Sequence, residues 1–206
     1  MAELQEVIFN FPDSFVTYRN QSFFASFAGN FNKSLAEEIK DFNEIINEMP
    51  AAHLQEHSLE IQLPFMQAAL GDFSFVPLLM GDQSENTCRK LAAAIHQAAG
   101  GRKILIVASS DLSHFHDYNT AKKLDEVILR HLKESDAAGL METLTGGTAE
   151  ACGGGPTVAV MAAARKLGAN QIRVLSHTNS GEVSGDRNRV VGYLSAVAYQ
   201  VPAGEA

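Results

Sequence analysis

The sequence predicts an α/β fold with a mainly parallel or mixed sheet and helices on both faces of that sheet. Short apolar runs of strand length, at 73–80 and 103–109, alternate with longer segments of helical period. Strands separated by helices usually pair in parallel. The chain has 206 residues, 46% of them hydrophobic, and can bury a sizeable core. We therefore expect a single domain over residues 1–206.

The first seventy residues carry the least regular signals. The aromatic-rich start shows no clean period, and a helical pattern begins only at 35–49. In 58–70, alternate positions from Leu59 to Phe65 are apolar, as in a strand. Apolar residues also recur there at helical spacing, at Leu59, Leu63, Met66 and Leu70. Length and the cap position of Ser58 favour a helix, which Pro64 would bend.

The remaining elements follow one another with clear boundaries. The expected order is a strand at 73–80, a helix at 84–99, a strand at 103–109, helices at 118–132 and 136–144, a helix from Pro156 to a stop at Gly168, and strands at 171–178 and 190–199. The last two strands flank a Gly/Asn/Asp-rich connection and are expected to add an antiparallel edge.

Composition excludes several classes of protein. The net charge of −8 is spread along the chain, without a Lys/Arg stripe, so nucleic acid is not an expected partner. No run reaches the roughly 18 apolar residues of a membrane span, and the start lacks a signal-peptide pattern. Cys88 and Cys152 are too few for a disulfide framework. We expect a cytoplasmic protein with no membrane contact.

The stretch "ASSDLSHFHD" is the first candidate site, because it directly follows the apolar strand at 103–109. In open α/β sheets, ligands bind outside the carboxyl ends of the strands. Asp111 and His114 are three residues apart, so the carboxylate could orient the imidazole, or both could face one ion. Alternatively, Asp111 or Ser113 caps the helix that begins near residue 118. His116 and Asp117 are expected to be cap and solvent residues.

Cys152, in "CGGGPT", is the second candidate. It precedes three glycines and a helix N-terminus, where backbone N–H groups and the helix dipole favour a thiolate. Such a cysteine could be a nucleophile or a soft metal ligand. The alternative is a buried small residue in a tight turn.

Two further groups are open to either interpretation. Glu56, His57 and Glu60 would share one helical face, as a histidine between carboxylates or as an ordinary exposed helix start. Asp186 and its neighbours lie in a Gly-rich turn that could be a site or a simple hairpin loop. The sequence lacks the G-x-S-x-G, GxxxxGK[ST] and GxGxxG patterns of serine hydrolases and nucleotide-binding proteins.

Five segments in the same order and spacing resemble the MEMO family, also called AmmeMemoRadiSam system protein B. They are "EHSLEIQLPFMQ", "FVPLLMGDQ", "ILIVASSDLSHF", "CGGGPTVAVMAAARKLGA" and "SGDRNRVVGYLSAVAY", and they span about residues 56–199. The resemblance implies an α/β fold similar to the class III extradiol dioxygenases, which bind non-haem iron through histidines and a carboxylate.

The resemblance also implies a set of site residues. Asp111, His114 and Cys152 match the family's crevice residues and are the expected metal ligands. His57 matches the histidine of the family's EHS segment, with a supporting role. The other expected pocket or supporting residues are Glu56, Ser110, Gly153, Gly154 and Asp186. Iron and copper are the expected metals, and a Cys152 thiolate would favour copper(I).

The sequence departs from the family at its N-terminus. Relatives have Pro-His-Ala-Gly-Tyr-like and Gly-Pro-x-His segments, which supply two more crevice histidines, whereas the first histidine here is His53. We therefore expect a MEMO-like domain shortened at its N-terminus, through truncation or as a shortened paralogue. Missing strands would expose a sheet edge, so self-association or a covering partner is expected.

Two functional hypotheses follow from this resemblance. The favoured one is a binding or accessory protein that accepts a protein or peptide partner at a crevice like a metal site. The alternative is a metal-dependent oxidoreductase, holding iron or copper and related to the extradiol dioxygenases. The absence of two crevice histidines favours the first, and whether the protein is an enzyme stays open.

Overall fold

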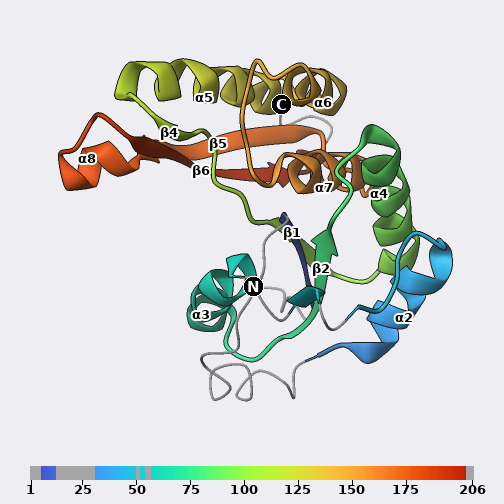
Figure 1. The fold of residues 1–206 in the computed structure, drawn as a ribbon. Coiled ribbons are helices and arrows are strands. Elements are labelled where there is room, and N and C mark those ends of the chain that lie inside the picture. Colours follow the sequence, from blue (N-terminus) through green and yellow to red (C-terminus); the bar gives the residue numbers. More distant parts are fainter. Residues whose placement is uncertain (1–5, 13–30, 50–51, 54–56, 203–206) are drawn as a thin grey trace. The chain divides into compact units, whose positions relative to one another are not determined.

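The computed structural model describes residues 6–12, 31–49, 52–53 and 57–202, and it shows an α/β chain (Figure 1). The chain divides into two compact units, Met1–Ser109 and Ser110–Ala206. The expectation of one domain stays a prediction, since compact units can belong to one domain. Within the described ranges, no helix is long and apolar enough to cross a membrane.

A parallel three-stranded sheet forms the centre of the first unit. Strand β1 (Glu6–Pro12) lies between β2 (Ser74–Met80) and β3 (Ile104–Ala108), and Glu6 is paired with both Ser74 and Ile104. The two predicted strands and their parallel direction are confirmed to within a residue. The sequence analysis missed β1, because its aromatic and polar residues do not alternate cleanly over a longer window.

Helix α3 (Ser58–Leu70) settles the ambiguity between strand and helix. Leu59 and Leu63 are buried and pack with Phe73 and Phe75, while Ile61, two positions from each leucine, is 60% exposed. A strand would have put all three alternate residues on one face. The helical stripe is therefore the correct interpretation, and Pro64 is accommodated inside the helix.

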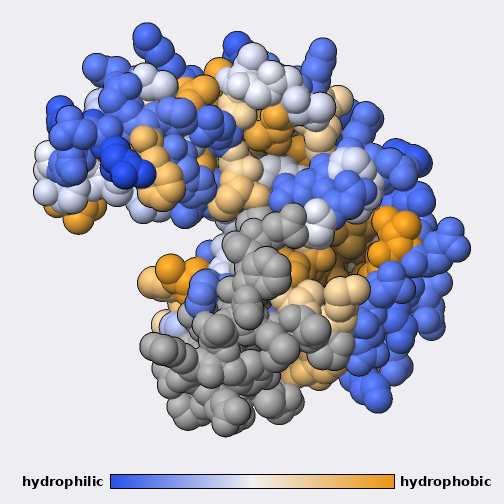
Figure 2. Space-filling model, in the orientation of Figure 1, coloured by the Kyte–Doolittle hydropathy of each residue, from blue (hydrophilic) through white to orange (hydrophobic). Residues whose placement is uncertain are grey.

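Two further helices complete the described part of the first unit. Helix α2 (Lys33–Phe42) packs on α4 (Glu85–Ala99), whose N-cap is Ser84, as predicted. The prediction that α2 continues to residue 49 is wrong, since Asn43 is extended and ends the helix. Both helices present hydrophilic residues outward in Figure 2, as expected for amphipathic helices with one buried face.

The second unit is built on an antiparallel three-stranded sheet in the order β4-β6-β5. Its strands are β4 (His114–His116), β5 (Gln171–Asn179) and β6 (Val190–Tyr199). The expected antiparallel pairing of the last two strands is confirmed. The expectation of an α/β fold with a mainly parallel or mixed sheet is confirmed in part: the α/β class holds, and the described strands form one parallel and one antiparallel sheet in place of a single sheet. The sequence analysis missed β4, because a strand of three residues is too short to show a periodic pattern.

Four helices belong to the second unit. They are α5 (Tyr118–Lys133), α6 (Ala137–Thr145), α7 (Gly154–Lys166) and α8 (Ser180–Ser184). Helix α5 runs along β5 and β6, and α6 packs against both α5 and α7 (Figure 1). The first three were predicted to within two residues at each end. Helix α8 occupies the connection that the sequence left as loop or site.

Replacing Leu63 with Ala tests the packing of α3. The leucine is fully buried, so its loss should lower the free energy of unfolding by about 2–5 kcal/mol through lost burial and a cavity. Ile61→Ala on the exposed face is the matched control, with an expected change of about 0.5 kcal/mol. Urea unfolding measures both, and equal losses would contradict the assigned helical face.

Candidate functional site

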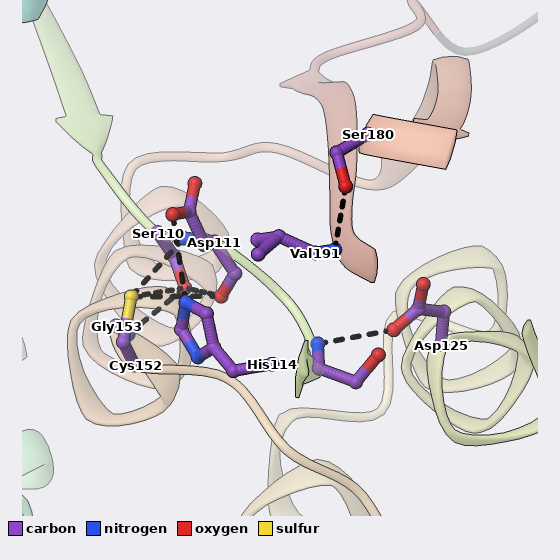
Figure 3. A network of polar contacts seen from close by, with 9 residues as sticks. Ser110, Asp111, His114, Asp125, Cys152, Gly153, Ser180 and Val191 are labelled. Atoms are coloured by element: carbon purple, nitrogen blue, oxygen red, sulfur yellow. Dashed lines mark hydrogen bonds and ion pairs between the residues drawn. The ribbon is translucent and has the colours of Figure 1, made fainter. Parts of the chain in front are cut away.

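Two distant segments of the second unit meet in a network of polar contacts (Figure 3). The Asp111 N–H donates to Cys152 Sγ (3.1 Å), and the Cys152 N–H donates to the Asp111 carbonyl (3.2 Å). Beside this reciprocal pair, the Gly153 N–H donates to Ser110 Oγ (2.9 Å). Longer contacts of Cys152 Sγ with the Asp111 carbonyl (3.6 Å) and with Ser110 Oγ (3.9 Å) add to these three hydrogen bonds, so Cys152 is positioned by the other segment.

His114 joins the network through a carboxylate. Its Nε2 lies 3.5 Å from Asp111 Oδ2, with the imidazole about one third exposed and the carboxylate about half exposed. The contact is long for a hydrogen bond and weak at this exposure, so it orients the ring more than it stabilises the fold. These contacts bring Asp111, His114, Cys152, Ser110 and Gly153 together, and their expected role as a metal or binding site stays a prediction.

The capping interpretation of this segment is wrong for Asp111 and Ser113. Asp117 is the N-cap of α5 and accepts from the N–H groups of Asn119 and Thr120, which confirms its expected role. Hydrogen bonds from the Thr120 hydroxyl and backbone lower the pKa of Asp117. Because Asp117 caps the helix, the Asp111 carboxylate is not used as a cap and faces His114 instead.

His116 was expected to be a cap or solvent residue, and the structure gives it a partner instead. Its Nε2 lies 2.9 Å from Glu150 Oε2, in a half-buried pair. Glu150 stands two residues before Cys152 in the sequence, so this pair links the same two segments a second time. His116 thus supports the network without joining it.

The glycines after Cys152 have a steric role. Helix α7 begins at Gly154, with Gly153 at its N-cap, and both are buried. A Cβ on Gly154 would lie 2.7 Å from a methyl carbon of Leu144, so a larger residue would displace that side chain. Cys152 itself is exposed, which contradicts the alternative of a buried small residue in a tight turn.

Asp125 on α5 holds the segment that carries Asp111 and His114 in place. The sequence analysis did not identify Asp125. Its carboxylate is fully buried and accepts a hydrogen bond from the Ser113 N–H (3.1 Å), drawn as a dashed line to Asp125 in Figure 3. His177 Nε2 lies 3.2 Å from the same carboxylate. Backbone hydrogen bonds join Ser113 and Leu112 to Gly192 of β6. A Cβ on Gly192 would lie 2.1 Å from the Asp125 carboxylate, so only glycine fits there.

A usable signal for Asp125 was present in the sequence. The buried stripe of α5 runs through Ala121, Asp125, Ile128 and Leu132 at helical spacing. A carboxylate in an otherwise apolar stripe must have buried partners, because an unpaired buried charge is strongly unfavourable. The partners themselves, on β5 and in the loop before β4, could not be identified from the sequence.

For the other predicted pocket residues the structure describes local contacts alone, and their role in a site stays a prediction. His57 is exposed at the N-cap position of α3, in the first unit. Glu56 lies outside the described residues. Asp186 is exposed in the turn after α8 and accepts from the Asn188 N–H (2.9 Å), which is the role of a loop residue. Gly154 borders the network only through its neighbour Gly153.

A second group of polar side chains lies at the turn between α5 and α6. His131, Glu134 and Asp136 place one potential ligand atom each within 4.8 Å of one another, so this cluster could hold a metal ion. Among the described residues, it is the group of three that meets this distance, and the donor atoms of Asp111, His114 and Cys152 do not. The spacing H-x-x-E-x-D was its sequence signal.

The comparisons with known proteins identify the family of this chain. The model of the Memo-like protein family matches residues 30–197, which include the whole polar network. The chain belongs to the Memo-like protein family. It is 38% identical over 167 residues to a MEMO1 family protein of Thermotoga neapolitana and 36% identical over 170 residues to one of Methanobrevibacter smithii.

These matches cover most of this chain but only part of each relative. In both cases 81% of this chain is aligned, against 59% of the Thermotoga protein and 60% of the Methanobrevibacter protein. A MEMO1 family protein of Methanosarcina barkeri is 38% identical over 80% of this chain and 61% of its own length. The chain thus spans about six tenths of the length of these Memo-like relatives.

Removing the Asp125 carboxylate should destabilise the protein strongly. Asp125→Ala leaves the Ser113 N–H without its acceptor and His177 without its partner, and should lower the free energy of unfolding by about 3 kcal/mol. The neighbouring exposed Glu126→Ala is the control, with a change within about 0.5 kcal/mol. If denaturant unfolding gave the two variants equal stability, Asp125 would not be the anchor.

The two cysteines should differ sharply in reactivity. Burial raises the pKa of the Cys88 thiol to about 11, so at pH 8 it stays protonated and covered, whereas Cys152 is exposed. Alkylation of the folded protein with iodoacetamide should modify one thiol per chain, as read by mass spectrometry. Cys152→Ser should abolish that reaction and Cys88→Ser should leave it intact. The opposite pattern would refute the assignment.

Proposed function

We propose that this Memo-like chain is a binding or accessory protein whose recognition site is the network of Ser110, Asp111, His114, Cys152 and Gly153. The reciprocal hydrogen bonds between Asp111 and Cys152 are the main support. The Cys152 sulfur accepts from the Asp111 N–H and lies within donor distance (3.6 Å) of the Asp111 carbonyl, and both Cys152 and His114 remain accessible to solvent. Such a surface is suited to binding a partner, because polar groups that are already ordered lose little conformational entropy on binding.

An exposed aromatic residue beside the network supports a protein or peptide partner. Phe115 is 62% exposed and has a positive φ of 63°, a strained conformation for an aromatic residue. Its ring contacts His114 on one side, and the Arg189 guanidinium lies 5.0 Å from its centroid. Aromatic and arginine side chains are the ones enriched at binding hot spots. We extend the proposal to recognition of a protein segment at Phe115.

The second candidate is a metal-dependent oxidoreductase, with a fold of the class III extradiol dioxygenase type. The donor set supports it, because a thiol, an imidazole and a carboxylate suit copper(I) or iron(II). Cys152, His114 and Asp111 would hold the ion, and the bound metal would supply the redox chemistry. Catalytic sites generally use three protein ligands at close range, and these three do not meet the 4.8 Å spacing. The binding role therefore has the better support.

Anaerobic titration of the reduced full chain with copper(I) and iron(II) tests the shared site. We expect His114→Ala and Cys152→Ser each to weaken any one-to-one binding by about tenfold or more, since each removes a ligand. His116→Ala is the matched control, because its imidazole pairs with Glu150 and should change the affinity little. Equal losses in His114→Ala and His116→Ala would refute the ligand assignment.

Oxygen uptake then separates the two candidates. A binding protein should consume no oxygen beyond the rate of the free metal, with or without reductant. An oxygen-uptake rate that rises in proportion to the amount of bound metal, and is lost in Cys152→Ser, would overturn the proposal in favour of the oxidoreductase.

A further inference from the structure

We infer that the open edge of β5 is an interface between two copies of this chain, whose β5 strands pair antiparallel about a two-fold axis. This interface shares no residue with the Asp111–Cys152 network and does not depend on the function proposed for that network. Three observations carry the inference: the unpaired edge of the sheet, the lack of protection along it, and the distribution of charge.

Strand β5 has an open row of backbone groups within the described part of the chain. In the order β4-β6-β5 it pairs with β6 alone, from Gln171 to Asn179. About half of the residues in such an edge strand point their N–H and C=O groups away from the neighbouring strand. Another extended strand satisfies the whole row at once, because its own groups have the same spacing. The chemistry of the edge therefore calls for a β-strand as the occupant.

The edge lacks most of the features that prevent strand pairing in other proteins. Strand β5 contains no proline, lysine or acidic residue, and its one formal charge is on Arg173. The remaining device is a bulge at Leu175, where the pairing with β6 shifts between Val174 and Ser176. The Leu175 side chain is 58% exposed, so an apolar group lies at the middle of the open edge.

The edge is also held in place from behind. Helix α5 packs along β5, and His177 of the strand lies 3.2 Å from the buried Asp125 carboxylate of that helix. A strand that is already ordered loses little conformational entropy when a second strand pairs with it. Rigidity therefore favours association at this edge.

The distribution of charge favours a second copy as the occupant. The chain has a net charge of −8, so two copies repel each other over most of their surfaces. Strands β5 and β6 together contain no acidic residue and one basic residue, Arg173. Two copies that meet at β5 therefore bring no carboxylates of these strands together.

The sequence of β5 is complementary to itself in an antiparallel register. With the two-fold axis between Val174 and Leu175, Arg173 lies opposite Ser176 of the second copy. Four residues of β5 share one face of the sheet, because their partners alternate along β6: Gln171, Arg173, Ser176 and Thr178. In this register each of these polar side chains meets another one, and Val174 meets Leu175 at the centre.

The interface leaves the polar network accessible. Strand β4, which carries His114, lies at the opposite edge of the same sheet. A two-fold dimer thus presents the network twice, once at each end of a continuous antiparallel sheet. If the network is the recognition site that we propose, a partner with two matching segments binds both copies with increased avidity.

Sedimentation equilibrium of the full chain over a range of concentrations tests the interface, and we expect a reversible dimer. Leu175→Lys puts two like charges close to the axis and should weaken the dimer by about tenfold or more. Ile61→Lys is the matched control, because Ile61 is an equally exposed apolar residue on α3, and it should leave the dimer unchanged. Circular dichroism should show both variants folded, since neither position is buried.

Disulfide trapping tests the register. In a Cys152→Ser background, a mixture of Arg173→Cys and Ser176→Cys chains should oxidise to a mixed dimer on a non-reducing gel. Opposed Cα atoms are about 4.5–5.5 Å apart, within disulfide range, whereas two copies of residue 173 lie about 10 Å apart. Arg173→Cys alone should therefore link poorly. A chain that is monomeric at every concentration, equal weakening by Leu175→Lys and Ile61→Lys, or a dimer without the mixed disulfide would overturn the inference.

Discussion

The buried carboxylate of Asp125 is the constraint on which the site of the second unit depends. It accepts from the Ser113 backbone, lies against His177 of β5, and fills the space that Gly192 of β6 leaves open. A charge removed from water needs polar partners, and here they are Ser113 in the loop before β4 and His177 on β5. The loop that carries Asp111 and His114 is thereby fixed to helix and sheet together.

On this base, the contact between Asp111 and Cys152 assembles the functional groups. The two residues are 41 positions apart and exchange hydrogen bonds through backbone and sulfur. Such a junction holds the thiol and the imidazole of His114 on rigid supports, which is the requirement for recognition with little loss of conformational freedom. This rigidity is the basis on which we propose a binding role for this member of the Memo-like family.

The two histidine–aspartate pairs of the second unit differ in which partner is buried. In the pair of His177 and Asp125 the carboxylate is almost fully buried, and the imidazole is partly exposed. In the pair of His131 and Asp136 the imidazole is buried, and the carboxylate is 41% exposed. The first arrangement anchors the fold, because the charge cannot be reached. The second leaves the carboxylate open to solvent, so it contributes less to holding the fold.

The sequence by itself determined the family, most helices and strands, and the candidate residues Asp111, His114 and Cys152. These follow from local periodicity, from caps such as Ser84 and Asp117, and from motifs that lie within short segments. Strand β1, the end of α2 and the choice of cap before α5 were missed or left open, because local patterns there fit more than one conformation.

Only the tertiary structure decided which groups meet. Asp125 contacts Ser113 and His177 across 12 and 52 residues, and the Thr143 hydroxyl lies 2.9 Å from His131 Nε2 across 12 residues. The separation into a parallel and an antiparallel sheet is likewise a matter of pairing between distant strands. Such contacts depend on chain packing in three dimensions, and no periodicity along the sequence records them.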